Sequence, residues 1–149
     1  AKMRLFEIEV DGRVFGRLRG DGIILATPTG STSYALSSGG PIVDPTVEAI
    51  VMTSLAPFQV TQRAVLLDPM RLIGIRLVDP DKDALVVVDG QDEVPAPGGS
   101  RVLAYRSPRY AAIIRFESRF FERMQTHGIL PWSAKVPQGV DDADLPPPA

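Results

Sequence analysis

Cysteine is absent from the 149 residues of this sequence, and histidine occurs once. The lack of cysteine excludes disulfide bonds and thiolate metal sites and is typical of a reducing compartment, while a single histidine makes a zinc site improbable. No apolar run approaches the roughly 20 residues of a membrane-spanning helix, and no signal peptide is visible. The net charge of −2 provides no attraction for nucleic acid or an anionic membrane. We therefore expect a cytoplasmic protein that binds neither nucleic acid nor membrane.

Several motifs of nucleotide binding and hydrolysis are also missing. The chain contains no Gly-x-x-x-x-Gly-Lys-[Ser/Thr] phosphate loop, no Gly-x-Gly-x-x-Gly fingerprint and no Gly-x-Ser-x-Gly elbow. His127 precedes Gly128 just after an expected helix, where a histidine interacts favourably with the last carbonyls, so we do not expect it to be catalytic. Asp92 and Glu93 are adjacent acids of the kind found on solvated surfaces, and we expect no metal site.

What the chain does contain is a series of short apolar segments separated by proline and glycine. With 44% hydrophobic and 23% charged residues, the composition is that of an ordinary globular domain. Asp11-Gly12 and Asp89-Gly90 are hairpin turn signals. The frequent turns predict a mainly β fold, an antiparallel β-sandwich of short strands with two short helices, at residues 32–38 and 118–126. The expected strands are residues 5–10, 14–18, 23–26, 49–53, 64–67, 72–78, 84–88, 101–105 and 110–116.

The densest concentration of polar chemistry follows the apolar strand at residues 23–26. The next residues, Thr-Pro-Thr-Gly-Ser-Thr-Ser-Tyr-Ala-Leu-Ser-Ser-Gly-Gly-Pro, run from 27 to 41 and crowd hydroxyl groups between two apolar segments. Ser31 or Thr32 is expected to cap the helix, and Gly30 to allow close approach of a ligand. Hydroxyls and backbone N–H groups aimed at one spot would bind an anion or a sugar edge. The alternative is a capped turn without a ligand.

The pattern formed by this segment is specific. Asp21-Gly22, four apolar residues and Thr-Pro-Thr-Gly-Ser-Thr-x-Tyr-x-x-Ser-x-Gly-Gly-Pro-Ile resemble the signature of the NAD kinase family. These enzymes use ATP or polyphosphate to phosphorylate the adenosine 2′-hydroxyl of NAD. The resemblance covers roughly residues 1–133 and includes Pro45, the Pro57 to Arg63 segment, the 88–91 turn and Trp132. The predicted fold is accordingly that of the family's C-terminal domain.

The resemblance implies a set of residues that bind NAD. Asp21 would contact the carboxamide end of NAD, although a carboxylate between two glycines can also cap a turn. Arg19 matches a ligand-facing basic position, with an exposed arginine at a strand end as the alternative, and Gln91 belongs to a turn that approaches the site. The full set is Arg19, Asp21, Thr32, Ser33, Tyr34, Ala35, Leu36, Ser37 and Gln91, with Lys2, Thr27 and Gly30 as weaker candidates.

Other parts of the family pattern are missing. The Gly-Gly-Asp-Gly loop that carries the expected general base and the Asn-Glu pair that grips the NAD ribose and adenine do not occur, and the first residue is alanine. Phe58 follows Pro57 where the family usually has histidine. We expect residues 1–135 to be the second domain of a longer enzyme, without a catalytic residue of its own, and residues 136–149 to be a disordered acidic tail.

For the whole enzyme, the resemblance implies NAD and NADP as ligands, ATP or polyphosphate as the phosphoryl donor, and Mg²⁺ bound with the donor rather than by this chain. It also implies a homodimer or homotetramer. Two other classes stay open: a diverged lipid-kinase-like or regulatory relative on the same fold, and a non-enzymatic β-sandwich interaction module. The hydroxyl-rich segment argues against the interaction module, because such surfaces more often carry aromatic anchors.

Overall fold

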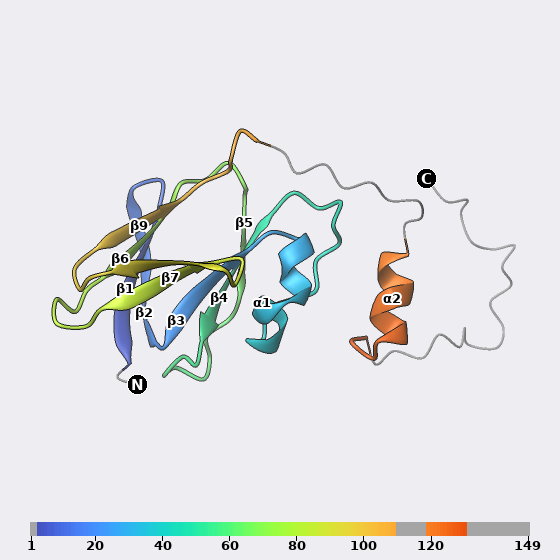
Figure 1. The fold of residues 1–149 in the computed structure, drawn as a ribbon, viewed down its shortest axis with the longest axis horizontal. Coiled ribbons are helices and arrows are strands. Elements are labelled where there is room, and N and C mark those ends of the chain that lie inside the picture. The colour runs from blue at the N-terminus through green and yellow to red at the C-terminus, as the bar shows by residue number, and fades with distance from the viewer. Residues whose placement is uncertain (1–2, 110–118, 131–149) are drawn as a thin grey trace, which may run out of the picture. The chain divides into compact units, whose positions relative to one another are not determined.

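The computed structural model describes residues 3–109 and 119–130. By its internal contacts the chain divides into two units, Ala1–Tyr110 and Ala111–Ala149, and each is described by itself. The first unit contains three antiparallel β-sheets, the 3₁₀ helix η1 and the short helix α1, and the second contains the helix α2 (Figure 1).

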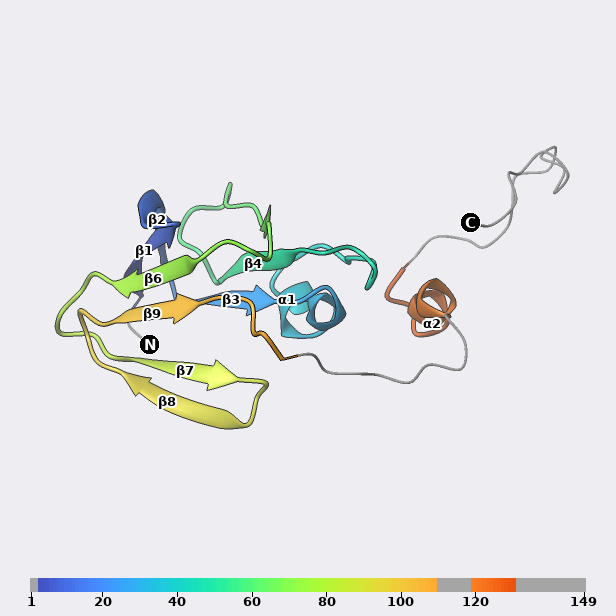
Figure 2. The same ribbon diagram turned by 90° about the horizontal axis from the view of Figure 1, so that it is seen from above.

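A four-stranded sheet contains β1 (Arg4–Val10), β2 (Arg13–Gly20), β6 (Ile73–Leu77) and β9 (Arg101–Ala104) in the order β2-β1-β6-β9. A three-stranded sheet contains β3 (Gly22–Ala26), β4 (Ile50–Leu55) and β5 (Val65–Leu67), in chain order. The hairpin of β7 (Ala84–Val88) and β8 (Asp92–Ala96) is a sheet of its own (Figure 2). All neighbouring strands are antiparallel.

The hydrophobic core lies between the four-stranded and three-stranded sheets. Ile8 and Leu18 from the first sheet pack with Met52 from the second, and all three are buried. The partly buried residues around them are Ile23, Leu25, Val65 and Leu67, which come from β3 and β5. Burial of apolar surface contributes about 25 cal/mol per Å², so this contact holds the two sheets together. The predicted antiparallel β-sandwich is confirmed.

Strand β1 alternates between apolar and acidic residues, and its acidic face is paired with arginine. Glu7 and Glu9 are buried, and their carboxylates accept bonds from Arg17, at 2.8 Å, and from Arg101. Gly74 lies opposite Glu9 in β6, and a Cβ there would meet the Arg101 guanidinium at 3.3 Å. The missing side chain makes room for the ion pair. Arginine and glutamate thus cover this face of the sheet, while the opposite face forms the core.

Both predicted Asp-Gly hairpins are present. Asp11 and Gly12, between β1 and β2, have φ values of 51° and 76°, and Asp89 and Gly90, between β7 and β8, have values of 50° and 70°. Two successive positive φ angles are the requirement of a type I′ turn, whose twist matches that of the flanking strands.

The strand β8 was not predicted. Its acidic start, Asp92 and Glu93, indicated a solvated surface, and Pro95 indicated a turn. Proline is tolerated here because, among the described residues, β8 pairs with β7 alone, so one edge of the strand needs no donor. The predicted strand at 110–116 and the predicted tail at 136–149 lie outside the described residues, and so does Trp132.

The helix predicted at residues 118–126 is α2 (Phe120–Thr126). His127 is its C-cap, and Gly128, with φ +67°, donates from its N–H to the carbonyl of Gln125 at 2.9 Å. Ile129 donates to the carbonyl of Met124, also at 2.9 Å, which completes a Schellman motif. His127 therefore ends a helix, as predicted. No helix within the described ranges has the length and apolar character needed to span a bilayer.

Asp79 gives the fold a predictable dependence on pH. A hydrogen bond from Lys82 Nζ (2.9 Å) and a second from the backbone N–H of Leu5 (3.1 Å) hold the pKa of Asp79 below its ordinary value of 3.8. Because the folded-state pKa is the lower one, the stability that Asp79 contributes is complete above about pH 4 and is lost as the pH falls through the folded-state pKa.

We therefore expect Asp79→Asn to lower the melting temperature at neutral pH and to differ less from the wild type at about pH 2. Thermal unfolding at both pH values tests this, with Asp81→Asn as the control, because Asp81 is an exposed aspartate of the same loop. An equal difference between the Asp79 variant and the wild type at both pH values would contradict the assignment.

Candidate functional site

Asp21 lies where the chain passes from one sheet to the other. β2 ends at Gly20 and β3 begins at Gly22, so Asp21 is the single residue that links a strand of one sheet to a strand of the other. A Cβ on Gly20 would meet the carbonyl oxygen of Leu55 at 3.0 Å, and the N–H of Asp21 donates to that same oxygen at 2.9 Å. The backbone at this corner is therefore fixed against the end of β4. The side chains of Arg19 and Asp21, on either side of Gly20, are exposed.

The segment Pro57-Phe58 runs beside this corner. The N–H of Phe58 donates to the carbonyl of Arg19 at 2.8 Å, and the Phe58 side chain is 67% exposed. The position where histidine was expected is thus adjacent to two candidate ligand-binding residues, Arg19 and Asp21. Phe58 offers an apolar ring there instead of a titratable group. Arg63, further along the same segment, is exposed.

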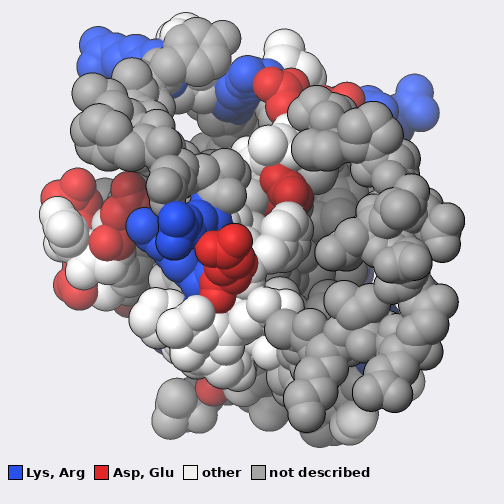
Figure 3. Space-filling view, turned by 90° about the vertical axis from the view of Figure 1, so that its right-hand side faces the viewer, with Lys and Arg blue, Asp and Glu red and all other residues white. Residues whose placement is uncertain are grey.

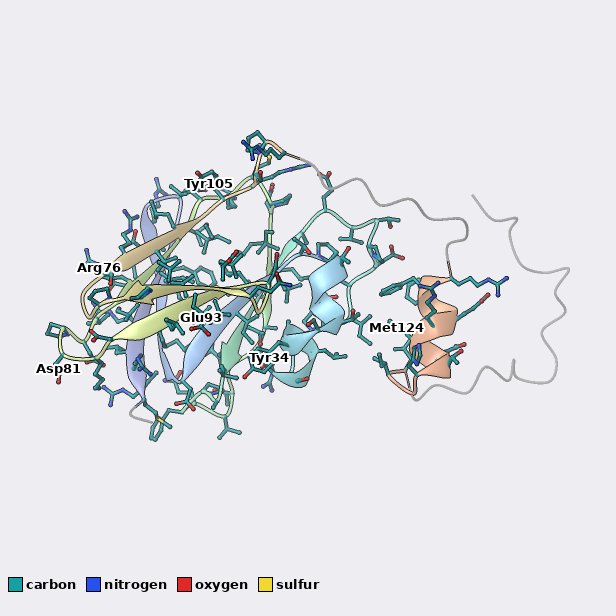
Figure 4. All side chains as sticks on the ribbon, in the orientation of Figure 1. Tyr34, Arg76, Asp81, Glu93, Tyr105 and Met124 are labelled. Atoms are coloured by element: carbon teal, nitrogen blue, oxygen red, sulfur yellow. The ribbon has the colours of Figure 1, made fainter. Side chains whose placement is uncertain are left out.

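The hydroxyl-rich segment forms η1 (Thr29–Thr32) followed by α1 (Tyr34–Ser37), which together occupy most of the predicted helix. Thr27, Ser33 and Ser37 are exposed, Thr32 is half-buried, and Tyr34 is 59% exposed on the outside of α1 (Figure 4). We call residues 27–38 the hydroxyl loop. It starts at the end of β3, so the strand that follows Asp21 leads directly into it.

The expected helix cap was wrong. The cap of α1 is Ser33, with no side-chain cap bond, and the Ser31 and Thr32 hydroxyls donate to the carbonyls of Pro28 and Thr29. Backbone donors were also expected to point at a ligand. Instead, the N–H groups of Gly30, Ser31, Ser33 and Leu36 donate within the loop, to Thr27 Oγ1, Pro28, Gly30 and Ser33. These four N–H groups already have partners within the loop, whereas the side chains of Thr27, Ser33, Tyr34 and Ser37 are exposed.

Ala35 has a supporting place in the loop. Its side chain is 1% exposed, and its carbonyl accepts the N–H groups of Ser38 at 3.2 Å and Gly40 at 2.8 Å. A Cβ on Gly40 would lie 2.7 Å from that carbonyl oxygen, so only glycine allows this close approach. Leu36 is half-buried, and the hydroxyl oxygen of Ser38 is buried without a hydrogen-bond partner.

Gln91 belongs to the separate β7–β8 hairpin. Its N–H closes the turn by donating to the carbonyl of Val88 at 3.0 Å, and its side chain is exposed. Figures 1 and 2 both show the turn of this hairpin directed toward the end of the first unit where α1 lies. Gln91 is thus on the same side of the unit as the hydroxyl loop. Lys2 lies outside the described residues.

A pocket of 110 Å³ opens beside the start of the hydroxyl loop. Its wall is mainly apolar, but it brings Thr27 together with Arg71, Tyr105 and Arg106. Tyr105 is 72% exposed at this pocket (Figure 4). The remaining lining residues are Leu25, Ala26, Ile50, Pro69, Ile73 and Ala104. The sequence did not predict this pocket, because its residues come from four separate segments and carry no common motif.

Both arginines of the pocket are held by carboxylates. Arg71 contacts Asp11 at 2.5 Å, which keeps the pKa of that aspartate below its ordinary value, and Arg106 contacts Glu48 at 3.3 Å. These ion pairs hold the two guanidinium groups that line the pocket. Figure 3 shows a group of acidic side chains at the left edge of its view.

Two other aspartates of the first unit, Asp44 and Asp89, have structural roles. Asp44 Oδ1 accepts the N–H and the hydroxyl of Thr46, at 2.8 and 2.7 Å, and these bonds lower the pKa of Asp44. Asp89 is a turn residue with positive φ. Within residues 3–109 and 119–130, no three acidic or histidine side chains are grouped so that they could hold a metal ion.

The fold and the loop together define a β-sandwich domain with a candidate site for a polyhydroxylated ligand at one end of β3. A family model, the ATP-NAD kinase C-terminal domain, matches residues 1–116. This chain belongs to that family.

Curated relatives are similar over most of the chain. The NAD kinase of Methanospirillum hungatei is 45% identical over 124 residues, which are 83% of this chain and 46% of that protein. The NAD kinase of Methanothermobacter thermautotrophicus is 40% identical over 125 residues, 84% of this chain and 44% of that protein. The chain thus spans about half the length of these relatives.

Solved structures agree. The crystal structure of an Archaeoglobus fulgidus NAD kinase in complex with ATP matches with a TM-score of 0.75 and 34% identity, over 84% of this chain and 48% of that one. The yeast NADH kinase complexed with NADH matches with a TM-score of 0.62 and 35% identity, over 68% of this chain and 29% of that one. The predicted family and fold are confirmed.

Proposed function

We propose that this chain is the dinucleotide-binding part of an NAD kinase, which transfers a phosphoryl group from ATP or polyphosphate to the adenosine 2′-hydroxyl of NAD and so forms NADP. The observation that carries the proposal is the hydroxyl loop of an ATP-NAD kinase C-terminal domain, with its exposed Thr27, Ser33, Tyr34 and Ser37, which β3 connects to the corner that presents Asp21. Membership of this family does not favour a lipid-kinase-like relative or an interaction module.

In this proposal, Asp21 accepts a hydrogen bond from the nicotinamide carboxamide, and the hydroxyls of Thr32, Ser33 and Ser37 bond the sugar and phosphate groups. The exposed ring of Tyr34 supplies a stacking surface. Arg19 and Gln91, with Thr27 and Gly30 at the start of the loop, complete the binding surface. Phosphoryl transfer depends on positioning and electrostatic stabilisation, so a domain that only holds the acceptor makes a real contribution.

In this proposal, the part of the enzyme that carries the Gly-Gly-Asp-Gly loop binds the phosphoryl donor with its Mg²⁺ and supplies the general base. Mg²⁺ offsets the charge of the transferred phosphoryl group when it is bound. The described residues of this chain do not provide a ligand set that fits it. We also place the enzyme in the cytoplasm, where NAD and ATP are both available.

Titration of NAD and NADP into the complete enzyme, followed by calorimetry, tests the site. We expect Tyr34→Ala to weaken NAD binding about tenfold, because it removes an exposed ring from the hydroxyl loop. Tyr105→Ala distinguishes binding at the hydroxyl loop from binding in the pocket beside Thr27. Tyr105 is also an exposed ring, but it lines the pocket and is not part of the loop. Phe15→Ala, an exposed aromatic in β2, is the control. A loss confined to Tyr105→Ala would move the site from the loop to the pocket.

The proposed enzyme is a homodimer or a homotetramer assembled through this domain. The β7–β8 hairpin exposes Leu85, Val87 and Val94, and one edge of β8 pairs with no strand among residues 3–109 and 119–130. We expect sedimentation of the complete enzyme at micromolar concentration to show a dimer or a tetramer, and Val87→Lys to shift it toward monomer. A wild-type protein that sediments only as monomer would contradict this assembly.

A further inference from the structure

Hydroxyl groups of the loop are not equivalent. Thr27, Thr29, Ser33 and Ser37 present exposed side chains, whereas Ser31 is 0% exposed. It is one of the most completely buried side chains of the described residues, in the middle of a surface loop. A polar group is buried in this way only when its hydrogen bonds are satisfied, so the contacts of Ser31 show what it does.

The Ser31 hydroxyl joins two parts of the chain. It donates to the carbonyl of Pro28 at 2.7 Å and accepts the N–H of Val43 at 3.1 Å. Pro28 opens the loop, and Val43, which is itself buried, lies in the segment that leaves it. One oxygen therefore connects the start of the loop to the returning chain, and residues Thr32 to Ser37, which include the exposed Ser33, Tyr34 and Ser37, lie between the two connected points.

Two further hydrogen bonds hold the C-terminal part of the hydroxyl loop. Thr53 Oγ1, on β4, donates to the carbonyl of Ser38 at 3.2 Å, and the N–H of Gly40 donates to the carbonyl of Ala35 at 2.8 Å. Both act at the far end of α1. Ser31 is the contact at the near end, where Thr32 and Ser33 begin the candidate binding surface.

We propose that Ser31 is a positioning residue for NAD binding: it touches no ligand, and it holds the hydroxyl loop in the conformation that presents Thr32, Ser33 and Tyr34. This inference rests on the proposed function for the identity of the ligand. The loop geometry itself is a property of this chain and is tested separately below.

Ser100 provides a matched control. Like Ser31, it donates both its N–H and its hydroxyl to the carbonyl of a proline three residues earlier, Pro97. It lies between β8 and β9, in a turn that contributes nothing to the hydroxyl loop. Ser31→Ala and Ser100→Ala therefore remove the same local bond, and only the first also removes the bond to Val43.

The experiment measures NAD dissociation constants of the complete enzyme by calorimetry, at a temperature where thermal unfolding shows each variant to be folded. We expect Ser31→Ala to raise the dissociation constant about tenfold, Ser100→Ala to leave it within about twofold, and Ser31→Thr, which keeps the hydroxyl, to restore most of the affinity. If both alanine variants lower the melting temperature and neither alters the dissociation constant, Ser31 is only a stabilising residue and the inference is overturned.

Amide hydrogen exchange of residues 32–37 separates this inference from the proposed function. Faster exchange in Ser31→Ala, with no change in Ser100→Ala, supports the positioning role even if the wild-type enzyme binds no NAD, a result that would overturn the proposed function alone. Unchanged exchange in Ser31→Ala overturns the positioning role, whatever the protein binds.

Discussion

Purified residues 1–149 will form no detectable NADP from NAD, ATP and Mg²⁺. Phosphoryl transfer needs the acceptor hydroxyl in line with the donor phosphate, a group that takes its proton, and a metal ion that offsets charge. This chain supplies a candidate dinucleotide surface but no acidic cluster for a metal among its described residues, and its sequence lacks the Gly-Gly-Asp-Gly loop. NAD binding by the isolated chain will also be weak, because the absent Asn-Glu pair removes two or three hydrogen bonds worth about 1 kcal/mol each.

The measurement is an end-point assay for NADP with a coupled dehydrogenase, on the isolated chain and on the same chain joined to a domain that carries the Gly-Gly-Asp-Gly loop and the Asn-Glu pair. Circular dichroism shows that both samples are folded. We expect activity and NAD binding only in the joined protein. Magnesium-dependent NADP formation by the isolated chain would refute this division of labour and make Asp21, Asp44 and Asp89 the candidates for the base.

The strands were predictable because their signals are local. Alternation in residues 5–10, the two Asp-Gly turns and the proline and glycine between apolar runs are each sufficient to place a strand or hairpin within one or two residues. β8 shows the limit of this approach. Whether Pro95 is compatible with a strand depends on whether the strand has one neighbour or two, and that is a property of the sheet rather than of the segment.

The sequence segment that contains the candidate site could be predicted from its resemblance to a family signature. The hydrogen bonds that shape the site could not. The role of Ser31 depends on Val43, twelve residues later, and a helix-cap argument that considers only near neighbours assigned its hydroxyl to the wrong partner. Phe58 and Arg19 are joined by a backbone bond between residues 39 positions apart, which no periodicity predicts. Tertiary hydrogen bonds decided each of these cases.

Asp21→Ala in the complete enzyme will weaken NAD binding by about 1–3 kcal/mol, which corresponds to roughly 5- to 150-fold in the dissociation constant. The N–H bond of Asp21 to the carbonyl of Leu55 fixes the backbone at this corner, and the Asp21 side chain is exposed. In the proposed site this carboxylate accepts a charge-assisted bond from the amide N–H of the ligand, and the substitution removes that bond.

Because the Asp21 side chain is exposed, the same substitution should leave the melting temperature nearly unchanged. Asp21→Asn is the more demanding variant, since it keeps the shape of the side chain and removes only the charge. We expect its NAD affinity to lie between those of the wild type and Asp21→Ala. Asp81→Ala, in the exposed loop between β6 and β7 (Figure 4), controls for the loss of one negative charge elsewhere. An Asp21→Ala enzyme with unaltered NAD affinity and normal stability would remove Asp21 from the site, and with it the corner between β2 and β3 as the place where the carboxamide end binds.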